Sequence, residues 1–543
     1  MKKIAIGFLV LFLLAFGAVL YGEKWLSANL PGIINQNEDR NYDILFEEVD
    51  IRIFSGSIDF QNITIVPLED SLSTSVNGSV SKIRMRGVRI LQLILEKKIN
   101  IVELRLEEPA FRLIRKDVNS KPEESSKAFQ DLFRDIVTRG LIQNFVLENG
   151  TAELYIQKDS LVRFGQFTDL NILAEGIRTD SATVTNTVPF QVENIHSSLK
   201  NFQIQVSENQ VMKMGEMDFD YKDREFILQD LSMKFKESWT DVAKKKGFQV
   251  DMIEFDLKEL KISSIKTDSD PFGQWTIIAE KVLLDSLNFH DGRDKNLERP
   301  NEVVKERISE LIKSIPFPLE LDTLQITNSD ISYSEVPMGK SEAGTIHFKE
   351  FNALILNVSS IDSVQRDGDL VVEVDTKLNG AGALNVVIKV PYNSGDFKLL
   401  AKLGPMDMTV LNPTLEHMAS VKVASGNIRG MVLEMAADGY KSRNRFTLDY
   451  QNLQIDLSKM TDEGEKKNVL LSKVANLAIK KDHLPSDNNY QIPTYTTTRN
   501  RYRSFFNLIW LSAKDGFFEV IPTGIAKKII GAKEKKANKS KAQ

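Results

Sequence analysis

Carboxylates are the residues of this sequence with the clearest capacity for chemistry. Glu47-Glu48-Asp50 and Glu107-Glu108 each bring acidic side chains together, as an acid–base pair or a calcium site requires. No glycine-containing loop of the EF-hand kind surrounds either group, so solvated strand faces are the simpler interpretation. Ser55-Gly56 offers a hydroxyl, but the sequence has no GxSxG elbow, and such a pair is typical of a turn.

The composition argues against several further kinds of site. The 543 residues include no cysteine, so a disulfide or a thiolate nucleophile is excluded. Five histidines lie far apart, which argues against a histidine-rich metal site; they are His196, His290, His347, His417 and His483. The 70 basic and 75 acidic residues give a net charge of −5, which does not suit a general nucleic-acid binder. We therefore expect no enzymatic activity, no cofactor, no metal and no nucleic-acid partner.

The N-terminal residues predict a membrane anchor. Residues 4–21 carry no charge, and in a helix they would rise about 27 Å, close to the roughly 30 Å hydrocarbon core of a bilayer. Two lysines precede this segment and an acidic run follows it, which predicts a cytoplasmic N-terminus and an extracytoplasmic body. The alternative is a cleaved signal peptide with Ala15 and Gly17 at the cleavage site. The predicted anchor residues are Ile4, Phe8, Leu11, Leu14, Phe16, Leu20 and Trp25.

Short runs of alternating polarity predict that most of the body is β-strand. Residues 384–390, 370–374 and 397–403 alternate with a period of two, which is typical of half-buried strands. Turn residues separate the runs, and those at mid-chain include Asn149-Gly150 and Ser425-Gly426-Asn427. The regular helices of a doubly wound fold are missing between the runs.

Two amphipathic helices, predicted over residues 126–139 and 302–315, each precede a similar segment. Phe145, Leu147 and Asn149 of the first segment match Leu324, Ile326 and Asn328 of the second at a constant offset of 179. Each copy is expected to contain a helix, a hairpin and a further strand. Repetition of this kind indicates a chain that grows in one direction.

These patterns divide the chain into six expected segments. They are an anchor with a juxtamembrane helix (1–36), an N-terminal β-segment (37–122), a first helix with a β-repeat (123–297), a second helix with a β-repeat (298–380), a C-terminal β-segment (381–500), and amphipathic helices with a lysine-rich tail (501–543).

Three stretches carry characteristic packing motifs. One is NYDILFEEVDIRIFSGSIDFQNITIVP after the anchor, and another is KINIVELRLEEPAFRLIRKD, whose motif residues are Ile101, Leu104, Leu106, Pro109, Leu113 and Arg115. The third, near the C-terminus, contains the Asn412-Pro413 pair, Ser425-Gly426 and a Tyr450–Leu453 strand. Together these stretches resemble the AsmA-like family of Gram-negative envelope proteins.

The resemblance implies a mainly β fold in which one N-terminal transmembrane helix precedes an elongated, curled antiparallel sheet, a repetitive β-groove with a few amphipathic helices. The family is linked to phospholipid movement between the inner and outer membranes and to outer-membrane integrity. It implies an inner-membrane protein with its bulk in the periplasm, with phospholipid as its ligand. An outer-membrane or envelope protein partner is expected at the C-terminal end.

A curled sheet with alternating side chains supplies an apolar lining and a polar exterior. Acyl chains can move along such a lining, since each buried CH₂ contributes about 0.8 kcal/mol. About 25 strands at roughly 4.8 Å would give a sheet on the order of 120 Å long. The candidate lining residues are Ile58, Phe60, Leu104, Leu106, Leu147, Ile326, Leu384, Val386, Ile388, Phe446 and Leu448.

From residue 505 every fourth residue is apolar as far as residue 529, with Pro522 and Gly524 expected to split the segment into two helices. Residues 524–543 contain seven lysines and one glutamate. An apolar face beside lysines suits an interfacial helix on anionic lipid; the alternative is a helix that caps the end of the sheet. The candidate interfacial residues are Phe505, Ile509, Trp510, Phe517, Lys527 and Lys528.

A second function hypothesis belongs to another class. An exposed sheet edge can capture strands of a client protein, which would make the chain a non-enzymatic scaffold for the assembly of outer-membrane proteins. Charged substitutions on the lining separate the two hypotheses. They should stop the movement of lipid along a conduit, but they should leave a scaffold that acts through its sheet edge largely functional. A surface hydrolase is disfavoured, since the sequence lacks a nucleophile constellation.

Overall fold

The computed structural model describes most of the chain. The described residues are 17, 19–32, 35, 42–68, 74–89, 99–115, 140–157, 159–179, 191–269, 275–300, 303–315, 317–365, 368–394, 396–461, 464–467 and 469–524. The prediction of a mainly β protein is confirmed, since strands dominate these residues. The chain forms two compact units, one of Met1–Leu231 with Asp268–Trp275 and one of Ser232–Thr267 with Thr276–Gln543.

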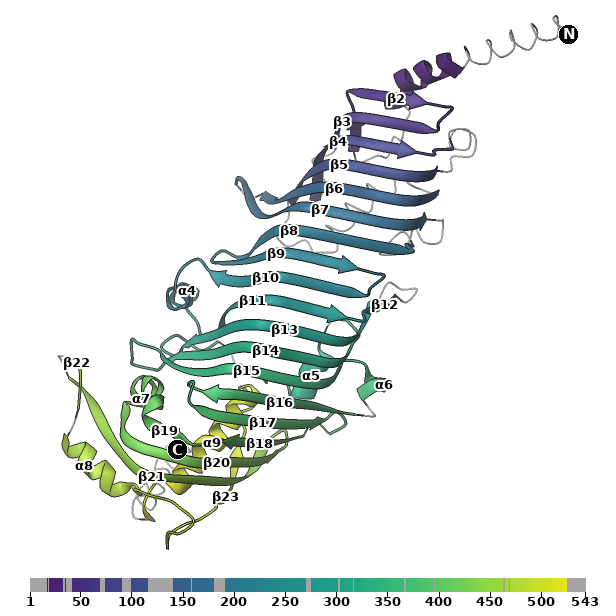
Figure 1. Ribbon diagram of the computed structural model, residues 1–543. Helices are drawn as coiled ribbons and strands as arrows, with labels where there is room; N and C mark the ends of the chain where they lie inside the picture. Colours follow the sequence, from purple (N-terminus) through teal and green to yellow (C-terminus); the bar gives the residue numbers. More distant parts are fainter. Residues whose placement is uncertain are drawn as a thin grey trace, which may run out of the picture. The chain divides into compact units, whose positions relative to one another are not determined.

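In the first unit β1 and β2 both pair with β3, and from β3 to β10 the strands follow one another in chain order, each beside the next (Figure 1). A helix over residues 19–32 precedes them. The strands are β1 (Tyr42–Leu45), β2 (Glu48–Arg52), β3 (Ser57–Pro67), β4 (Thr74–Arg86), β5 (Ile99–Arg115), β6 (Gly140–Gln157), β7 (Leu161–Thr179), β8 (Asn194–Ser207), β9 (Gln210–Asp220) and β10 (Glu225–Phe235), within which the unit boundary falls.

The second unit adds helices to a similar series of strands. Its strands are β11 (Met252–Ser263), β12 (Lys266–Ser269, at a unit boundary), β13 (Trp275–Asp294), β14 (Leu319–Val336), β15 (Gly344–Ser359), β16 (Asp369–Leu378), β17 (Gly382–Pro391), β18 (Phe397–Leu403), β19 (Met406–Asp407), β20 (Val421–Ala437), β21 (Lys441–Thr461), β22 (Gly464–Lys467) and β23 (Thr494–Thr498). Its helices are α4 (Trp239–Lys246), α5 (Ile308–Lys313), α6 (Asp362–Gln365), the 3₁₀ turn η2 (Met408–Leu411), α7 (Asn412–Ala419), α8 (Val469–Ala478) and α9 (Phe505–Val520).

The sheet is mixed, so the expectation of an antiparallel sheet is wrong at two of the described strand pairs. β5 pairs with β6, and β13 pairs with β14, in parallel register. The reason lies in the connections, because each parallel pair is joined by more than twenty residues that return the chain to the end at which it started. These two crossovers contain the segments in which the sequence predicts helices, so the repeat consists of strand, crossover and parallel strand.

The predicted helices within the crossovers have different outcomes. Residues 126–139 lie outside the described part of the chain. The helix predicted over 302–315 is shorter than expected, since α5 spans only Ile308–Lys313. Its start is fixed by Arg307, whose backbone N–H donates to Glu310 at 2.7 Å. The preceding residues extend instead along the C-terminal segment, where the Lys305 N–H donates to the Arg501 carbonyl at 2.8 Å.

Left-handed residues interrupt the long strands at matching positions. In the first unit Asn62, Glu108, Asn149, Asp169 and Asn201 all have φ between 51° and 57°. The strand registers place them beside one another across the sheet, and the register of β6 with β7 and of β7 with β8 shifts at these residues, which marks β-bulges. A bulge bends its strand and increases the local twist, so bulges in adjacent strands bend the sheet along one line.

The two predicted repeats share this bulge in detail. Asn149 and its counterpart Asn328 each donate a backbone N–H to an asparagine on the next strand at 3.1 Å, Asn171 and Asn352 respectively. Asn149-Gly150 therefore lies within β6 instead of forming a turn between strands, and residues 141–156 form one strand and not a hairpin. Ser425-Gly426-Asn427 likewise lies within β20.

Within the described residues, no helix combines the length and the apolar content needed to cross a bilayer. The predicted span over residues 4–21 falls mostly outside these residues, and with it the anchor candidates Ile4, Phe8, Leu11, Leu14 and Phe16. Leu20 and Trp25 lie in the helix over residues 19–32, and their side chains are 46% and 53% exposed.

Candidate functional site

The first unit has one apolar face and one charged face. The apolar face consists of cross-strand rows, of which one contains Phe60, Ile83, Leu106, Leu147 and Ile172 from β3 to β7. A neighbouring row places Ile58 beside Met85 and Leu104. All five lining candidates of this unit therefore lie on the same face, as the alternation of the sequence predicts.

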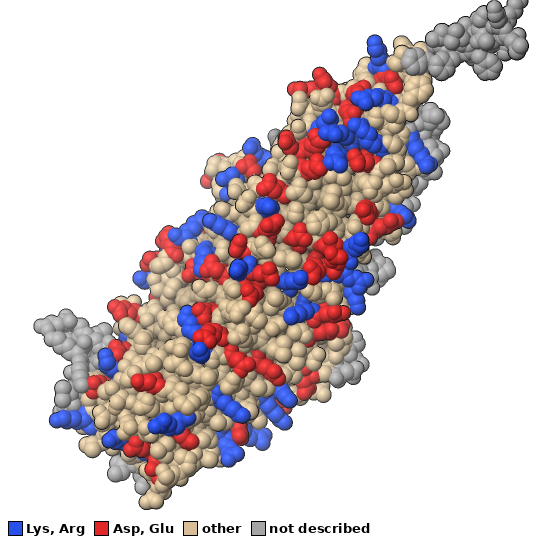
Figure 2. All heavy atoms as spheres, viewed as in Figure 1, with Lys and Arg blue, Asp and Glu red and all other residues tan. Residues whose placement is uncertain are grey.

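The opposite face of the first unit carries ion pairs between neighbouring strands. Arg84 pairs with Glu107, and Arg105 pairs with Glu148 at 2.6 Å. Figure 2 shows acidic and basic side chains interspersed on the visible face of this unit. Cross-strand charge pairs contribute about 0.2–1 kcal/mol each. Three of the carboxylates that could have supported acid–base chemistry have partners, since Glu47 accepts from Asn62 at 2.6 Å, Asp50 pairs with Arg52 at 2.6 Å and Glu107 pairs with Arg84.

In the second unit the apolar rows continue through nine strands. One row runs from β11 to β21 and contains Leu260, Leu284, Ile326, Ala353, Val374, Val386, Ala401, Leu433 and Phe446. Adjacent rows add Ile388 and Leu399, and Leu384 beside Leu403. We call this side of the second unit the apolar face. It contains all six of the lining candidates that lie in this unit, Ile326, Leu384, Val386, Ile388, Phe446 and Leu448.

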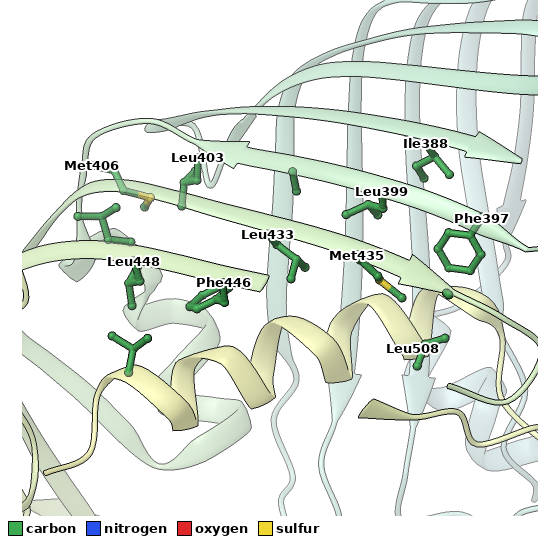
Figure 3. Close-up of a cluster of buried hydrophobic side chains, with 14 of the residues drawn as sticks. Ile388, Phe397, Leu399, Leu403, Met406, Leu433, Met435, Phe446, Leu448 and Leu508 are labelled. Carbon is green, nitrogen blue, oxygen red and sulfur yellow. The ribbon is translucent and has the colours of Figure 1, made fainter. Parts of the chain in front are cut away.

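Helix α9 covers one end of the apolar face. Figure 3 shows α9 lying across β18, β20 and β21, with Leu433 and Phe446 directed toward it. Phe446 and Leu448 are 0% exposed, and the Phe446 ring meets the Phe517 ring edge-on with centroids 5.3 Å apart. Phe446 and Leu448 therefore belong to a packed core and not to an open lining. We call the region of β18, β20 and β21 beneath α9 the closed half.

Polar contacts hold α9 in this position. Ser442 and Ser512 hydroxyls lie 2.9 Å apart and are both fully buried, and the Tyr495 hydroxyl donates to the Ser512 carbonyl at 2.6 Å. A Cβ atom at Gly516 would lie 2.5 Å from the Phe446 ring, so the helix approaches the sheet closely only because this position has no side chain. Of the predicted interfacial residues, Phe505, Ile509 and Phe517 contact this core, whereas Trp510 is 53% exposed.

The opposite face of α9 remains apolar and exposed. Phe506, Trp510 and Phe518 are 65%, 53% and 54% exposed. One face of α9 therefore covers the end of the sheet, and the opposite face of the same helix presents exposed apolar side chains. Lys527 and Lys528 lie outside the described residues.

Toward its other end the apolar face is covered only in part, by α5, which contacts β15 and β17 and whose Ile308 and Ile312 pack with Ile355 against the buried cluster. On β11, β13, β14 and β15, Leu284, Ile326 and Ile331 are partly exposed, and none of them belongs to a buried cluster in the described part of the chain. Phe289 and Phe348, on the row of Ile331, are partly exposed as well. We call this region the open half.

The first unit repeats this division. Its rows on β3, β4 and β5 are buried at Ile58, Phe60 and Val80, where Leu26 and Leu30 of the helix over residues 19–32 pack against them. On β8 and β9, Phe202 and Met212 are only partly buried. Each unit therefore has an apolar face that is covered near one end and partly exposed elsewhere.

His483 is the most buried of the five histidines, and it has a structural role in the closed half. It is 0% exposed, its Nδ1 lies 2.7 Å from the Leu448 carbonyl, and its Nε2 accepts from the Gln491 N–H at 3.2 Å. These contacts require a neutral ring with the proton on Nδ1. Burial lowers the pKa of His483 accordingly. In the described residues no three His, Asp or Glu side chains are grouped so as to hold a metal ion.

A shallow hollow of about 610 Å³ lies beside β23. Its lining includes Lys398, Glu434, Arg443 and Arg445. Charged side chains do not suit an acyl chain, because an apolar ligand would leave them without water or hydrogen-bond partners. The open half is therefore the better candidate for binding.

The chain matches no model of a known protein family and no curated protein. The resemblance to the AsmA-like family therefore stays a prediction from the segments quoted above. The features that sequence reasoning missed are the line of left-handed bulges and a charged cluster at the end of the open half. Asn and Asp within strand-like runs signal the bulges, since these residues tolerate positive φ best after glycine.

Proposed function

We propose that this chain is a membrane-anchored protein of the Gram-negative envelope that carries phospholipid between the inner and outer membranes and so supports outer-membrane integrity. The observation that carries the proposal is the apolar face of the second unit, whose rows run uninterrupted through nine strands and stay partly exposed in the open half. Exposed apolar surface of this extent is costly in water and marks a binding surface.

The chemistry of the open half suits acyl chains. Its rows consist of apolar residues, among them leucine, isoleucine, phenylalanine, valine and alanine, whose side chains cannot hydrogen-bond a polar ligand. Each CH₂ that leaves water on this surface contributes about 0.8 kcal/mol, and the rows are apolar within the open half, so an acyl chain moves along this region without crossing a polar barrier. No covalent step and no cofactor is required.

The two ends of the chain support attachment to membranes. Residues 4–21 supply the proposed inner-membrane anchor, with the N-terminus in the cytoplasm. The exposed Phe506, Trp510 and Phe518 on α9, followed by the lysines of residues 527–541, supply a second contact with lipid or with an envelope protein partner.

Lipid transfer between vesicles tests the proposal. Full-length protein reconstituted into donor vesicles is expected to move fluorescent phospholipid to acceptor vesicles. Ile326→Glu places a charge on the apolar face and should abolish transfer, whereas Gln325→Glu places the same charge on the opposite face of the same strand and should not. Equal transfer by both variants would contradict the proposal and favour the scaffold hypothesis.

A further inference from the structure

The apolar rows of the open half end in a cluster of charged residues. Beyond the Phe289 and Ile331 row, the next positions on the same face are Asp291, beside Tyr333, and then Arg293, beside Glu335. The equivalent pair in the first unit, Leu113 beside Leu154, is apolar. The two repeats therefore differ at this end of β13 and β14, where the second repeat has polar residues and the first has leucines.

Two polar atoms of this cluster have no hydrogen-bond partner in the described chain. Arg293 forms an ion pair with Asp251 through Nη2, but its Nε is buried and unsatisfied. Oδ1 of Asp291, two residues away on the same face, is buried and unsatisfied as well. Burial, followed by the charge of Asp251, raises the pKa of Asp291 to about 6. A free donor and a free acceptor thus lie close together, and each is costly to leave unpaired.

The C-terminal segment brings further arginines to the same place. Arg299 donates to the Tyr502 carbonyl at 2.9 Å, which fixes this segment beside the end of β13. The next residue, Arg503, is half-buried and makes no side-chain hydrogen bond or ion pair within the described residues. Burial and the neighbouring positive charges of Arg299 and Arg293 lower the pKa of Arg503.

Arg503 makes no ion pair within the described residues, and Arg299 and Arg293 lie close enough for their positive charges to lower its pKa, so an anion bound beside Arg503 would offset this repulsion. Guanidinium groups bind phosphate with strong, charge-assisted and often bidentate hydrogen bonds. The neighbouring carboxylates of Asp291 and Glu335 disfavour a ligand that carries only negative charge, and they suit a cationic group beside the phosphate.

We propose that Asp291, Arg293, Arg299, Tyr333 and Arg503 form a rim cluster that binds the headgroup of a zwitterionic phospholipid. The phosphate lies between Arg293, Arg299 and Arg503, and the amine of the headgroup faces Asp291. The acyl chains then extend over Phe289 and Ile331 into the open half. This inference rests on the proposed function, because it assigns the headgroup of the lipid whose chains the apolar face binds.

Binding of defined lipids to the full-length protein in detergent tests the inference. Phosphatidylethanolamine and phosphatidylglycerol with identical acyl chains serve as probes, and free phosphoethanolamine distinguishes a headgroup site from a site that needs acyl chains. Wild-type protein should bind phosphatidylethanolamine about tenfold more tightly than phosphatidylglycerol. Arg503→Gln should weaken phosphatidylethanolamine binding about tenfold, and Asp291→Asn should remove the preference between the two lipids.

Arg501→Gln is the matched control, since Arg501 is exposed and lies over the Tyr440 ring, 5.4 Å from its centroid. It should bind like the wild type. If Arg503→Gln does not fold, Arg503→Lys, which keeps the charge but not the bidentate geometry, is expected to show a smaller loss. Unchanged binding by Arg503→Gln or Arg503→Lys, or a wild type without lipid preference, would overturn the rim cluster while leaving lipid binding intact. Failure of every lipid to bind would overturn the proposed function as well.

Discussion

The closed and open halves of the second unit share the same rows of residues and differ in what covers them. Ile326 in the open half and Phe446 in the closed half belong to one row, yet Phe446 is fully buried and Ile326 is partly exposed. The difference lies in the covering helices, since α9 lies across β18, β20 and β21 (Figure 3) and also contacts β23, and α5 contacts β15 and β17. An apolar strand face is thus a packed core or a binding surface depending on an element that lies elsewhere in the sequence.

The largest contrast between the halves is expected in stability. Phe446→Ala should lower the free energy of unfolding of the second unit by about 3–5 kcal/mol, because it leaves a cavity beneath α9. Ile326→Ala should lower it by only about 1 kcal/mol, since a partly exposed side chain loses less transfer free energy. Urea denaturation of the full-length protein, followed by far-ultraviolet circular dichroism, measures both. Equal losses would show that the open half is also a packed core.

A smaller effect is expected where α9 approaches the sheet. Gly516→Ala should lower the free energy of unfolding by about 1–3 kcal/mol, because its Cβ would lie 2.5 Å from both the Phe446 ring and the Tyr495 hydroxyl oxygen. Gly430→Ala is the control, as no atom lies within 4 Å of the added Cβ. Thermal unfolding distinguishes the two, and a Gly516→Ala protein as stable as the control would contradict the close packing of α9.

The two halves should also respond to acid in opposite directions. The pKa of His483 in the closed half is lowered by folding, so the unfolded chain binds more protons below about pH 6.5 and stability falls as the pH decreases. The pKa of Asp291 in the open half is raised to about 6, so the folded state binds more protons and stability rises as the pH falls through 6. The effect of Asp291 is expected to be about 1 kcal/mol after solvent screening.

Hydrogen exchange from pH 7.5 to 5 measures these two effects region by region. Protection of β21 should decrease and protection of β13 should increase. Asp291→Asn should remove the increase on β13 and leave β21 unchanged. A parallel decrease in both regions would contradict the assignment.

The smallest expected effect concerns the bulge that the two repeats share. Asn328→Ala and Asn328→Gly both remove the side chain, but only alanine is strained at φ 51°. The alanine variant should therefore be less stable than the glycine variant by about 1 kcal/mol, as chemical denaturation can measure. The same pair of substitutions at Asn149 should give the same difference in the first unit.

The sequence predicts the strands and the residues of the apolar face, because a period of two fixes which side chains share a face. It does not predict which of them are covered, since the contact of Phe446 with Phe517 joins residues far apart in the chain. Asn149-Gly150 is misread as a turn for a local reason, because turns and bulges both need positive φ and so favour the same residues. The parallel pairs were missed because periodicity does not reveal strand direction.

The central claim is that the open half binds acyl chains, and site-specific photo-crosslinking tests it most directly. A benzophenone amino acid is placed at Ile326 on the apolar face, at Gln325 on the opposite face, and at Leu433 beneath α9. After irradiation in native membranes, mass spectrometry is expected to find phospholipid adducts at Ile326 only. Lipid adducts absent from Ile326, or protein adducts there in their place, would contradict the account.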